Sequence, residues 1–230
     1  MQLITILIIG VTVLFSMNAF NNYSLFERYK FQPQAILKGR EYDRLLTSGF
    51  LHVDFTHLLF NMLTLFFFAG VVIRFFTVVG GNSSVGSVIF AVVYLASIIG
   101  GNLLALLFQR NNYRYSAVGA SGGVSGILFA SIVIYPDLQL YLFFAIPMKG
   151  WFFALIYLAY SIYGMRKQLD NIGHEAHLGG ALVGLIAPLI FAPDLIYNEV
   201  SFLAVPVPLF ALLIVPIIVL FVMALKESKN

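Results

Sequence analysis

Seven long apolar stretches, separated by shorter polar connections, run along the 230-residue chain. Each is close to the roughly 20 apolar residues that an α-helix needs to cross a bilayer. Because lipid offers the backbone no hydrogen-bond partners, each stretch is predicted to be a helix. The stretches are residues 3–20, 56–78, 86–108, 118–135, 141–164, 176–192 and 202–225.

Two of these stretches contain residues that interrupt a helix. Pro147 and Lys149 fall inside the fifth stretch, so its helix is expected to begin near Gly150, after a loop over 136–149 partly held in the membrane interface. In the seventh stretch Pro216 predicts a kink, because proline has no N–H to donate to the preceding turn.

The connection over residues 21–55 differs from the other loops. It holds five basic and four acidic side chains, with Tyr, Phe and Leu recurring among them. It is therefore too polar to span a bilayer and too apolar for a disordered linker. We expect an ordered element that lies against the membrane.

Composition narrows the class of protein further. The chain is 60% hydrophobic and 10% charged, whereas soluble domains carry about 25% charged residues, so an integral multi-pass protein of the lipid bilayer is predicted. No cysteine is present, which excludes disulfides and thiolate chemistry. The net charge of +3, without a polybasic run, gives no reason to expect a nucleic-acid partner. The first stretch lacks a basic leader and a small-residue cleavage site, so we interpret it as a retained span.

Polar side chains are rare in the predicted spans, and several gather near the start of the second, fourth and sixth. His57 and Asn61 open the second span, Ser121 and Ser125 the fourth, and His177 the sixth. Polar groups inside a membrane are costly, so they are functional candidates by default. Alternate spans run in the same direction, which puts these residues on one side of the membrane at similar depth.

Glycines accompany two of these polar starts. They occur in pairs four residues apart, on one helix face, a spacing that lets membrane helices approach closely. The pairs are Gly119 and Gly123, Gly122 and Gly126, and Gly180 and Gly184. We expect the fourth and sixth spans to pack backbone against backbone, so that a short serine on one could reach a histidine on the other.

The three polar starts together resemble the rhomboid intramembrane serine proteases. The motifs "HLLFN" at 57–61, "GASG" at 119–122 and "AHLGGALVG" at 176–184 stand in the family's order and spacing. Residues 40–62 also resemble the segment that joins the family's first loop to its second helix. The resemblance covers residues 1–192. It implies an all-α, six-helix catalytic core over 1–192, and an extra C-terminal transmembrane helix with a short tail over 193–230, a 6+1 form. No cofactor or metal is implied.

The resemblance also implies a catalytic site. Ser121 would be the nucleophile of a Ser-His dyad and His177 its general base, since serine needs a base within hydrogen-bond reach. The oxyanion site would comprise His57, Asn61 and the Ser121 backbone N–H. Supporting residues are Glu41, Arg44 and His52, which stand at family spacing, and the glycines that permit close packing and substrate approach, Gly119, Gly122, Gly180 and Gly184.

Two positions depart from the family's pattern. Asp43 stands where a Trp often precedes the loop arginine, and Ser125 stands where a Tyr commonly packs on the catalytic histidine. No carboxylate is placed to complete a triad, since Glu175 is two residues from His177 and points to another face. Packing or a weaker hydrogen bond must therefore orient His177, and we expect slow turnover.

The implied activity is hydrolysis of peptide bonds in or near transmembrane segments of membrane-protein substrates. A helix hides its carbonyl groups, so substrates with helix-weakening residues near the end of a span are expected. Water would enter through a cavity open to one face of the membrane. We expect this cavity to be lined by His52, His57, Asn61, Ser116, His174 and Glu175.

Three other interpretations stay open at this point. An inactive rhomboid-like protein could bind membrane clients, although such relatives generally lose the serine or the histidine. A small transporter or proton path would need acidic residues in mid-membrane, and no span core has one. A metal site built from the four histidines (His52, His57, His174 and His177) matches no standard ligand spacing.

Two arguments give opposite predictions for the side of the membrane on which the 21–55 connection lies. Eleven of the thirteen Lys and Arg residues lie on the side of the 21–55 connection, which by the positive-inside rule would place it in the cytoplasm. The resemblance places this connection and the site on the extracytoplasmic side, in a bacterial plasma membrane. We favour the second orientation, because Glu41 is placed to pair with Arg44 and would neutralise part of the charge locally.

The first prediction tests this orientation. With seven spans, a reporter fused after Asn230 lies on the same side as the 21–55 connection. A reporter that works only outside the cytoplasm is expected to be active there. Activity of a cytoplasm-only reporter at the same position would show that the charge rule decides the orientation.

Overall fold

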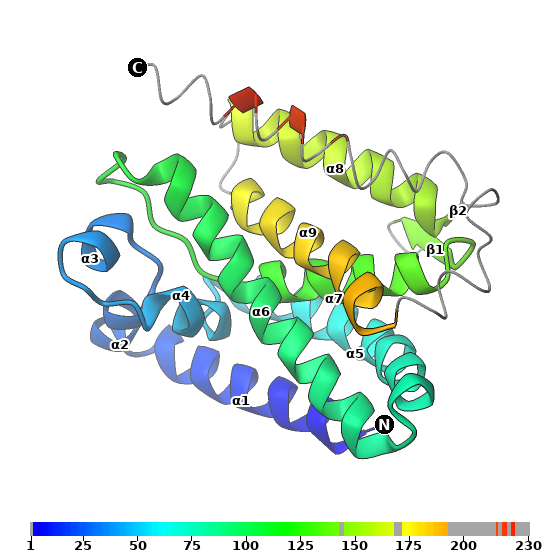
Figure 1. Ribbon diagram of the computed structural model, residues 1–230. Helices are drawn as coiled ribbons and strands as arrows, with labels where there is room; N and C mark the ends of the chain where they lie inside the picture. The colour runs from blue at the N-terminus through cyan, green and yellow to red at the C-terminus, as the bar shows by residue number, and fades with distance from the viewer. Residues whose placement is uncertain are drawn as a thin grey trace.

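The computed structural model describes residues 2–142, 145–167 and 172–192, together with Val215, Ile218, Val219, Val222 and Met223. Within these residues the chain forms helices and one two-stranded antiparallel sheet (Figure 1). In chain order the elements are α1 (Leu3–Phe20), α2 (Tyr23–Tyr29), α3 (Pro33–Leu37), α4 (Arg44–Thr47), the 3-10 helix η1 (Ser48–Phe50), α5 (Phe55–Gly80), α6 (Ser83–Gln109), α7 (Ser121–Ile134), β1 (Gln139–Leu142), β2 (Ile146–Lys149), α8 (Gly150–Lys167) and α9 (His174–Phe191).

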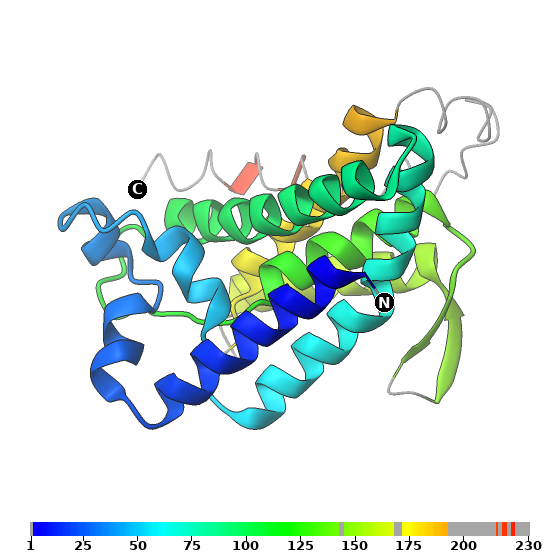
Figure 2. The same cartoon turned by 90° about the horizontal axis from the view of Figure 1, so that it is seen from below.

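Helix α7 is the centre of the bundle. Twelve of its 14 residues are buried, and it contacts α5, α6, α8 and α9. Helices α6, α8 and α9 cover it on one side, and α1 lies beside α5 on the other (Figures 1 and 2). A helix buried on all sides needs small or apolar residues around its whole circumference, which explains the sequence "SGGVSGILFASIVI".

Four of the described helices are long and apolar enough to cross a membrane, namely α1, α5, α6 and α9. Helix α7 is apolar but begins at Ser121, three residues later than predicted. Its 14 residues correspond to about 21 Å, which is shorter than the roughly 30 Å hydrocarbon core. The four long apolar helices confirm the predicted class, a mostly helical membrane protein. The predicted seventh span over 202–225 and its kink at Pro216 lie outside the described residues, apart from a few single positions.

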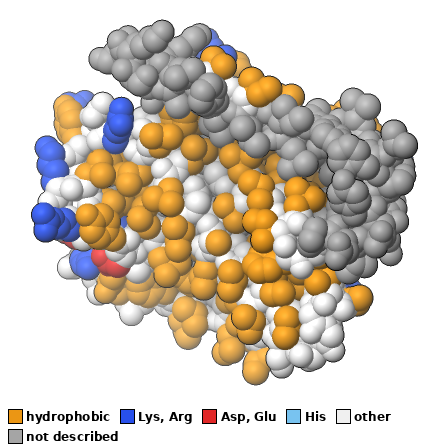
Figure 3. Space-filling model, viewed as in Figure 1, with side chains coloured by type: hydrophobic (Ala, Val, Ile, Leu, Met, Phe, Trp, Pro, Cys, Tyr) orange, Lys and Arg blue, Asp and Glu red, His pale blue; other side chains and the backbone are white. Residues whose placement is uncertain are grey.

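The surface fits this class. Hydrophobic side chains are spread over the described face in Figure 3, and Lys and Arg side chains gather at the end of the molecule that holds α2 and α3. Exposed large apolar residues are spread along the outer sides of the helices, as with Leu3 and Leu14 on α1 and Val78 on α5. Such a surface is stable against lipid tails.

The 21–55 connection is ordered, as the sequence indicated. It forms α2, α3, α4 and η1, and it buries Phe31 and Ile36 against Ala105 of α6. The buried Arg44 side chain donates to Glu41 Oε2 at 2.7 Å and to the backbone carbonyls of Glu27 (2.9 Å) and Lys30 (2.7 Å). A buried cation is tolerated when its donors are satisfied in this way, so Arg44 holds the connection together from inside.

The predicted loop over 136–149 is instead a β-hairpin. Strands β1 and β2 pair antiparallel, with Gln139 opposite Lys149 and Leu142 opposite Ile146. Pro147 and Lys149, which interrupt the fifth apolar stretch, lie in strand β2. The hairpin satisfies backbone groups that an irregular loop would leave to solvent. Helix α8 begins at Gly150, as predicted.

Helices α7 and α9 approach backbone to backbone. A Cβ atom added to Gly180 would overlap the carbonyl group of Gly122, and one added to Gly184 would overlap the carbonyl group of Gly126. Neither obstacle is a flexible side chain that could move aside. The glycine pairs of the two helices therefore set the distance between them.

The second prediction follows from this contact. Gly180→Ala is expected to destabilise the protein by about 1–3 kcal/mol, the usual cost of overpacking, and to lower the melting temperature in detergent. Gly10→Ala is the matched control, because a Cβ at Gly10 has no neighbour within 4 Å and alanine favours a helix by about 1 kcal/mol over glycine. Equal melting temperatures for both variants would contradict the backbone contact.

Candidate active site

An extended segment leads into α7, and the 21–55 connection holds it at three points. Phe31 and Ala117 form a two-way backbone bridge. The Gly119 N–H donates to the carbonyl of Ser48 at 3.0 Å, and the Ala120 N–H donates to His52 Nε2 at 3.3 Å. These bonds satisfy donors that lie outside any helix or sheet and fix the backbone directly before Ser121.

His52 acts here as a neutral hydrogen-bond acceptor. Ser16 Oγ donates its single hydrogen to the Phe50 carbonyl at 2.9 Å, so His52 Nδ1 must donate to Ser16 Oγ, also at 2.9 Å. This tautomer, assigned from the hydrogen-bond network, leaves Nε2 free to accept from Ala120. The ring is fully buried. Burial, and to a lesser degree the adjacent His57, lowers the pKa of His52 to about 3.

Gly119 brings two predicted site residues together. Its φ of +137° lies in the region that favours glycine. A Cβ atom there would lie 2.8 Å from His57 Cε1, 3.0 Å from His57 Nε2 and 3.6 Å from Ser121 Oγ. Both the backbone conformation and the space exclude other residues. The His57 ring and the Ser121 hydroxyl therefore face the same small gap.

Ser121 is the first residue of α7 and is half-buried. The N–H groups in the first turn of a helix have no partner within the helix, and the positive end of the helix dipole lies there. Since α7 is shorter than the hydrocarbon core is thick, its two ends cannot both reach the membrane surfaces.

His57 and Asn61 share one face of α5, as their spacing predicts. The helix is capped by Asp54, whose Oδ1 accepts from the His57 N–H at 2.7 Å. The Asn61 amide Nδ2 donates to the His57 carbonyl oxygen at 2.9 Å. One of its two amide hydrogens is thereby used within the helix, which leaves one N–H as a donor for a ligand.

His177 lies in the first turn of α9, close to the start of α7. A Cβ atom on Gly122 would lie 3.3 Å from the Ala176 carbonyl oxygen. The residues next to Ser121 and His177 are therefore in contact, and the two helix starts face each other. The His177 ring lies between aromatic neighbours, with ring centroids 6.0 Å from Tyr157 of α8 and 6.3 Å from His174.

Sequence reasoning missed Tyr157. Its ring stacks on His177 with an interplanar angle of 25°, and its hydroxyl lies 2.5 Å from Ser125 Oγ. The sequence signal for this contact was Ser125. A small residue at that position leaves room beside His177 for a ring from another helix. A tyrosine at similar depth on the fifth span could then have been sought.

Two expectations about neighbouring residues had different outcomes. Glu175 does point away from His177, because it accepts from Gln109 Nε2 of α6 at 2.7 Å. The expected cavity lining is wrong in part, since His52, His174 and Glu175 are 0%, 2% and 1% exposed and so do not open to a face of the protein. Gly164 of α8 lies directly against the His174 ring, which explains how that side chain is enclosed.

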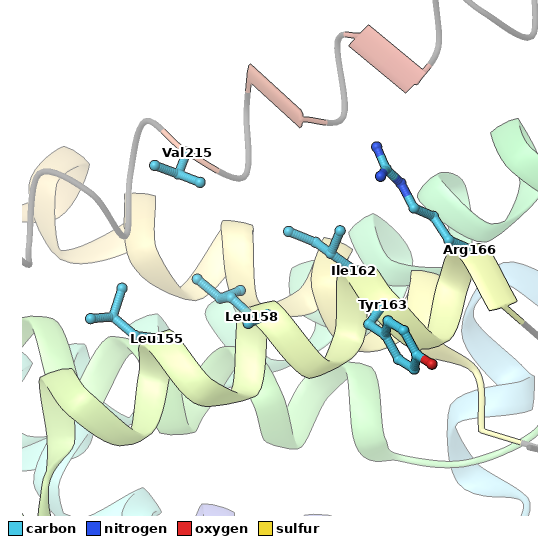
Figure 4. A pocket seen from close by; sticks show the side chains of 7 residues that line it. Leu155, Leu158, Ile162, Tyr163, Arg166 and Val215 are labelled. Atoms are coloured by element: carbon cyan, nitrogen blue, oxygen red, sulfur yellow. The ribbon is translucent and has the colours of Figure 1, made fainter. Parts of the chain in front are cut away.

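Among the described residues no three His, Asp or Glu side chains group as metal ligands. A mostly apolar cavity of about 560 Å³ lies on the outer side of α8, lined by residues that include Leu155, Leu158, Ile162, Arg166 and Val215 (Figure 4). It contains no predicted site residue.

Fold and site together define a helical membrane protein with a serine and a histidine at the facing starts of two packed helices. A family model described as the Rhomboid domain matches residues 39–194, more than half of the chain. The chain belongs to the rhomboid family.

Several curated proteins are similar to this chain. RHOMBOID-like protein 12, mitochondrial, of Arabidopsis thaliana is 30% identical over 193 residues, 77% of this chain and 54% of that protein. Rhomboid protein 1, mitochondrial, of Saccharomyces cerevisiae is 30% identical over 62% of this chain and 40% of its own length. Rhomboid protease GluP of Bacillus subtilis is 29% identical over 68% and 27%.

These relatives are informative about the length of the chain and about the membrane in which it was expected. The chain spans about half of their length or less. Two of the three carry mitochondrial names, so they give no support to the expectation of a bacterial membrane. Location in a membrane rests instead on the apolar helices.

The third prediction concerns the His52 contact. The pKa of His52 is lowered from 6.5 to about 3, so between these values the unfolded chain binds a proton that the folded protein does not. Stability is then present above pH 6.5 and falls as the pH decreases, by up to about 1.4 kcal/mol per pH unit. His52→Gln can keep both hydrogen bonds without this titration.

The measurement is the melting temperature in detergent at pH 7, 6 and 5. Wild type is expected to lose stability more steeply than His52→Gln as the pH is lowered. Parallel pH profiles for the two proteins would show that His52 is not held neutral in the fold.

Proposed function

We propose that this protein is an intramembrane serine endopeptidase that hydrolyses peptide bonds in or near transmembrane segments of membrane-protein substrates. The observation that carries the proposal is the space beside Gly119. The Ser121 hydroxyl and the His57 ring both border this space. Membership of the rhomboid family supports it, as does the similarity to a relative named as a rhomboid protease.

In this proposal Ser121 Oγ attacks the carbonyl carbon of the substrate, and His177 accepts the hydroxyl proton. The tetrahedral intermediate collapses, the C–N bond breaks, and His177 returns the proton to the leaving amine. A water molecule then attacks the acyl-enzyme, again with His177 as base. This releases the new carboxyl end of the substrate and restores the Ser121 hydroxyl.

The oxyanion of each tetrahedral intermediate needs donors that are already in place. We assign this role to the Ser121 backbone N–H, the remaining N–H of Asn61 and the His57 ring. Two observations support the assignment. The Ser121 N–H is in the first turn of α7, and the His57 ring atoms nearest to Gly119 are Cε1 and Nε2.

The substrate class follows from the short central helix. In this proposal the start of α7 is the end that lies below the membrane surface, so Ser121 meets peptide bonds that are themselves in or near the membrane. A stable helix occupies its carbonyl groups with hydrogen bonds. Substrates with helix-weakening residues near the end of a span are therefore favoured.

We also propose the finer architecture and orientation for this function. Residues 1–192 form the six-helix catalytic core, and residues 193–230 provide one further transmembrane helix and a short tail. The site opens to the extracytoplasmic side or its topological equivalent. Partial neutralisation of the 21–55 connection supports this orientation, since Arg28, Lys30 and Arg44 are all within 4 Å of carboxylates.

The fourth prediction tests the chemistry with a single-span model substrate and a serine-directed fluorophosphonate probe on purified protein. Ser121→Ala is expected to lose both cleavage and probe labelling, and His177→Ala to lose almost all cleavage. Asn61→Ala is expected to retain a little, because loss of one oxyanion donor costs about 10²–10³ in rate.

The matched control is Ser131→Ala, since Ser131 lies on the same helix but donates to the Ile127 carbonyl, away from the site. It is expected to cleave and to be labelled as wild type. Persistent labelling of Ser121→Ala would assign the nucleophile to another serine. Equal melting temperatures across the series would show that lost activity is not lost folding.

A further inference from the structure

Helix α8 provides a ring that stacks on His177. The Tyr157 and His177 rings are nearly parallel, at an angle of 25° and a centroid distance of 6.0 Å. The resemblance to rhomboid proteases implied a tyrosine at position 125 for such a contact, but that position holds Ser125. The stacking partner thus comes from a different helix of the bundle.

The Tyr157 ring is held in place from several sides. Its hydroxyl lies 2.5 Å from Ser125 Oγ of α7. Phe129 of α7 packs edge-on at 5.3 Å between centroids, and Phe153 of α8 lies at 6.0 Å. A ring with a hydrogen bond at its tip and aromatic neighbours at its sides has one orientation, so it can impose an orientation on His177.

We propose that Tyr157 is a positioning residue for His177, and that the hydroxyl of Ser125 fixes the Tyr157 ring at the height of the imidazole. This inference rests on the proposed function. The Tyr157 ring lies nearly parallel to the His177 ring, so stacking restricts rotation of the imidazole, the role that a carboxylate has in a Ser-His-Asp triad. The π-face of Tyr157 also favours the imidazolium that forms when His177 takes the proton.

A consequence concerns α8. Ser121 and His177 lie on α7 and α9, which are locked together by backbone contact at Gly122 and Gly180. Tyr157 lies on α8, which reaches this pair through side chains. In this proposal the orientation of the base therefore depends on the position of a third helix.

The test compares Tyr157→Leu with Tyr157→Phe in the cleavage assay. Tyr157→Leu removes the ring, and kcat is expected to fall about 10- to 100-fold with KM unchanged, because a misplaced group can cost about 10²-fold in rate. Tyr157→Phe keeps the ring but loses its hydrogen bond to Ser125, so kcat is expected to fall clearly less than in Tyr157→Leu. Phe152→Leu is the control, since Phe152 lies on the same helix and is 46% exposed.

Ser125→Ala removes the same hydrogen bond as Tyr157→Phe. The double variant is therefore expected to match the single variants, whereas multiplied losses would show that Ser125 acts independently of Tyr157. If Tyr157→Leu keeps the wild-type kcat, or if Tyr157→Phe is as slow as Tyr157→Leu, ring stacking does not position the base.

A spectroscopic readout separates this inference from the proposed function. The chain has only four histidines, so their ring C–H resonances can be assigned with ¹³C-labelled histidine and His177→Gln. Tyr157→Leu is expected to remove a ring-current shift from the His177 signals, and Tyr157→Phe to keep it. The shift is observable even if no substrate is cleaved, and its absence in wild type would overturn the stacking itself.

Discussion

The contact between the backbones of α7 and α9 is the constraint on which the rest of the structure depends. At Gly180, against the Gly122 carbonyl, and again at Gly184, against the Gly126 carbonyl, a Cβ atom has no room between the two helices. This distance is what brings the start of α7 opposite the start of α9. The hydrophobic effect does not drive helices together in lipid, so close van der Waals packing of small residues must do so.

The candidate site also requires that the backbone segment before α7 is held in one position. The segment before Ser121 is neither helix nor sheet, and its N–H groups are satisfied by Ser48, His52 and Phe31. Ser48 is itself held, since its hydroxyl donates to the Arg44 carbonyl and accepts from Asn102 of α6. The ordered connection between α1 and α5 is thus part of the site, because it determines where the backbone before Ser121 lies.

In our proposal the orientation of His177 depends on an aromatic ring, since the neighbouring carboxylate of Glu175 is bonded to Gln109. Aromatic rings contribute less directional energy than a charged hydrogen bond, but they cost no burial of charge in an apolar region. With Tyr157 on α8, the proposed base is held by a helix that contributes neither the proposed nucleophile nor the base.

Local pattern determined much of this protein by itself. Hydropathy placed α1 at its observed ends and the other described spans to within a few residues, because backbone burial in lipid forces helices wherever apolar stretches are long enough. Spacing put His57 and Asn61 on one face and paired the glycines. Only the tertiary structure decided that 139–149 pairs as a hairpin and that Tyr157, rather than a residue of α7, stacks on His177. It also decided that His52 accepts from Ala120. The contacts of Tyr157 with His177 and of His52 with Ala120 join residues far apart in the chain, and they depend on the rotation and depth of whole helices, which hydrophobic periodicity does not specify.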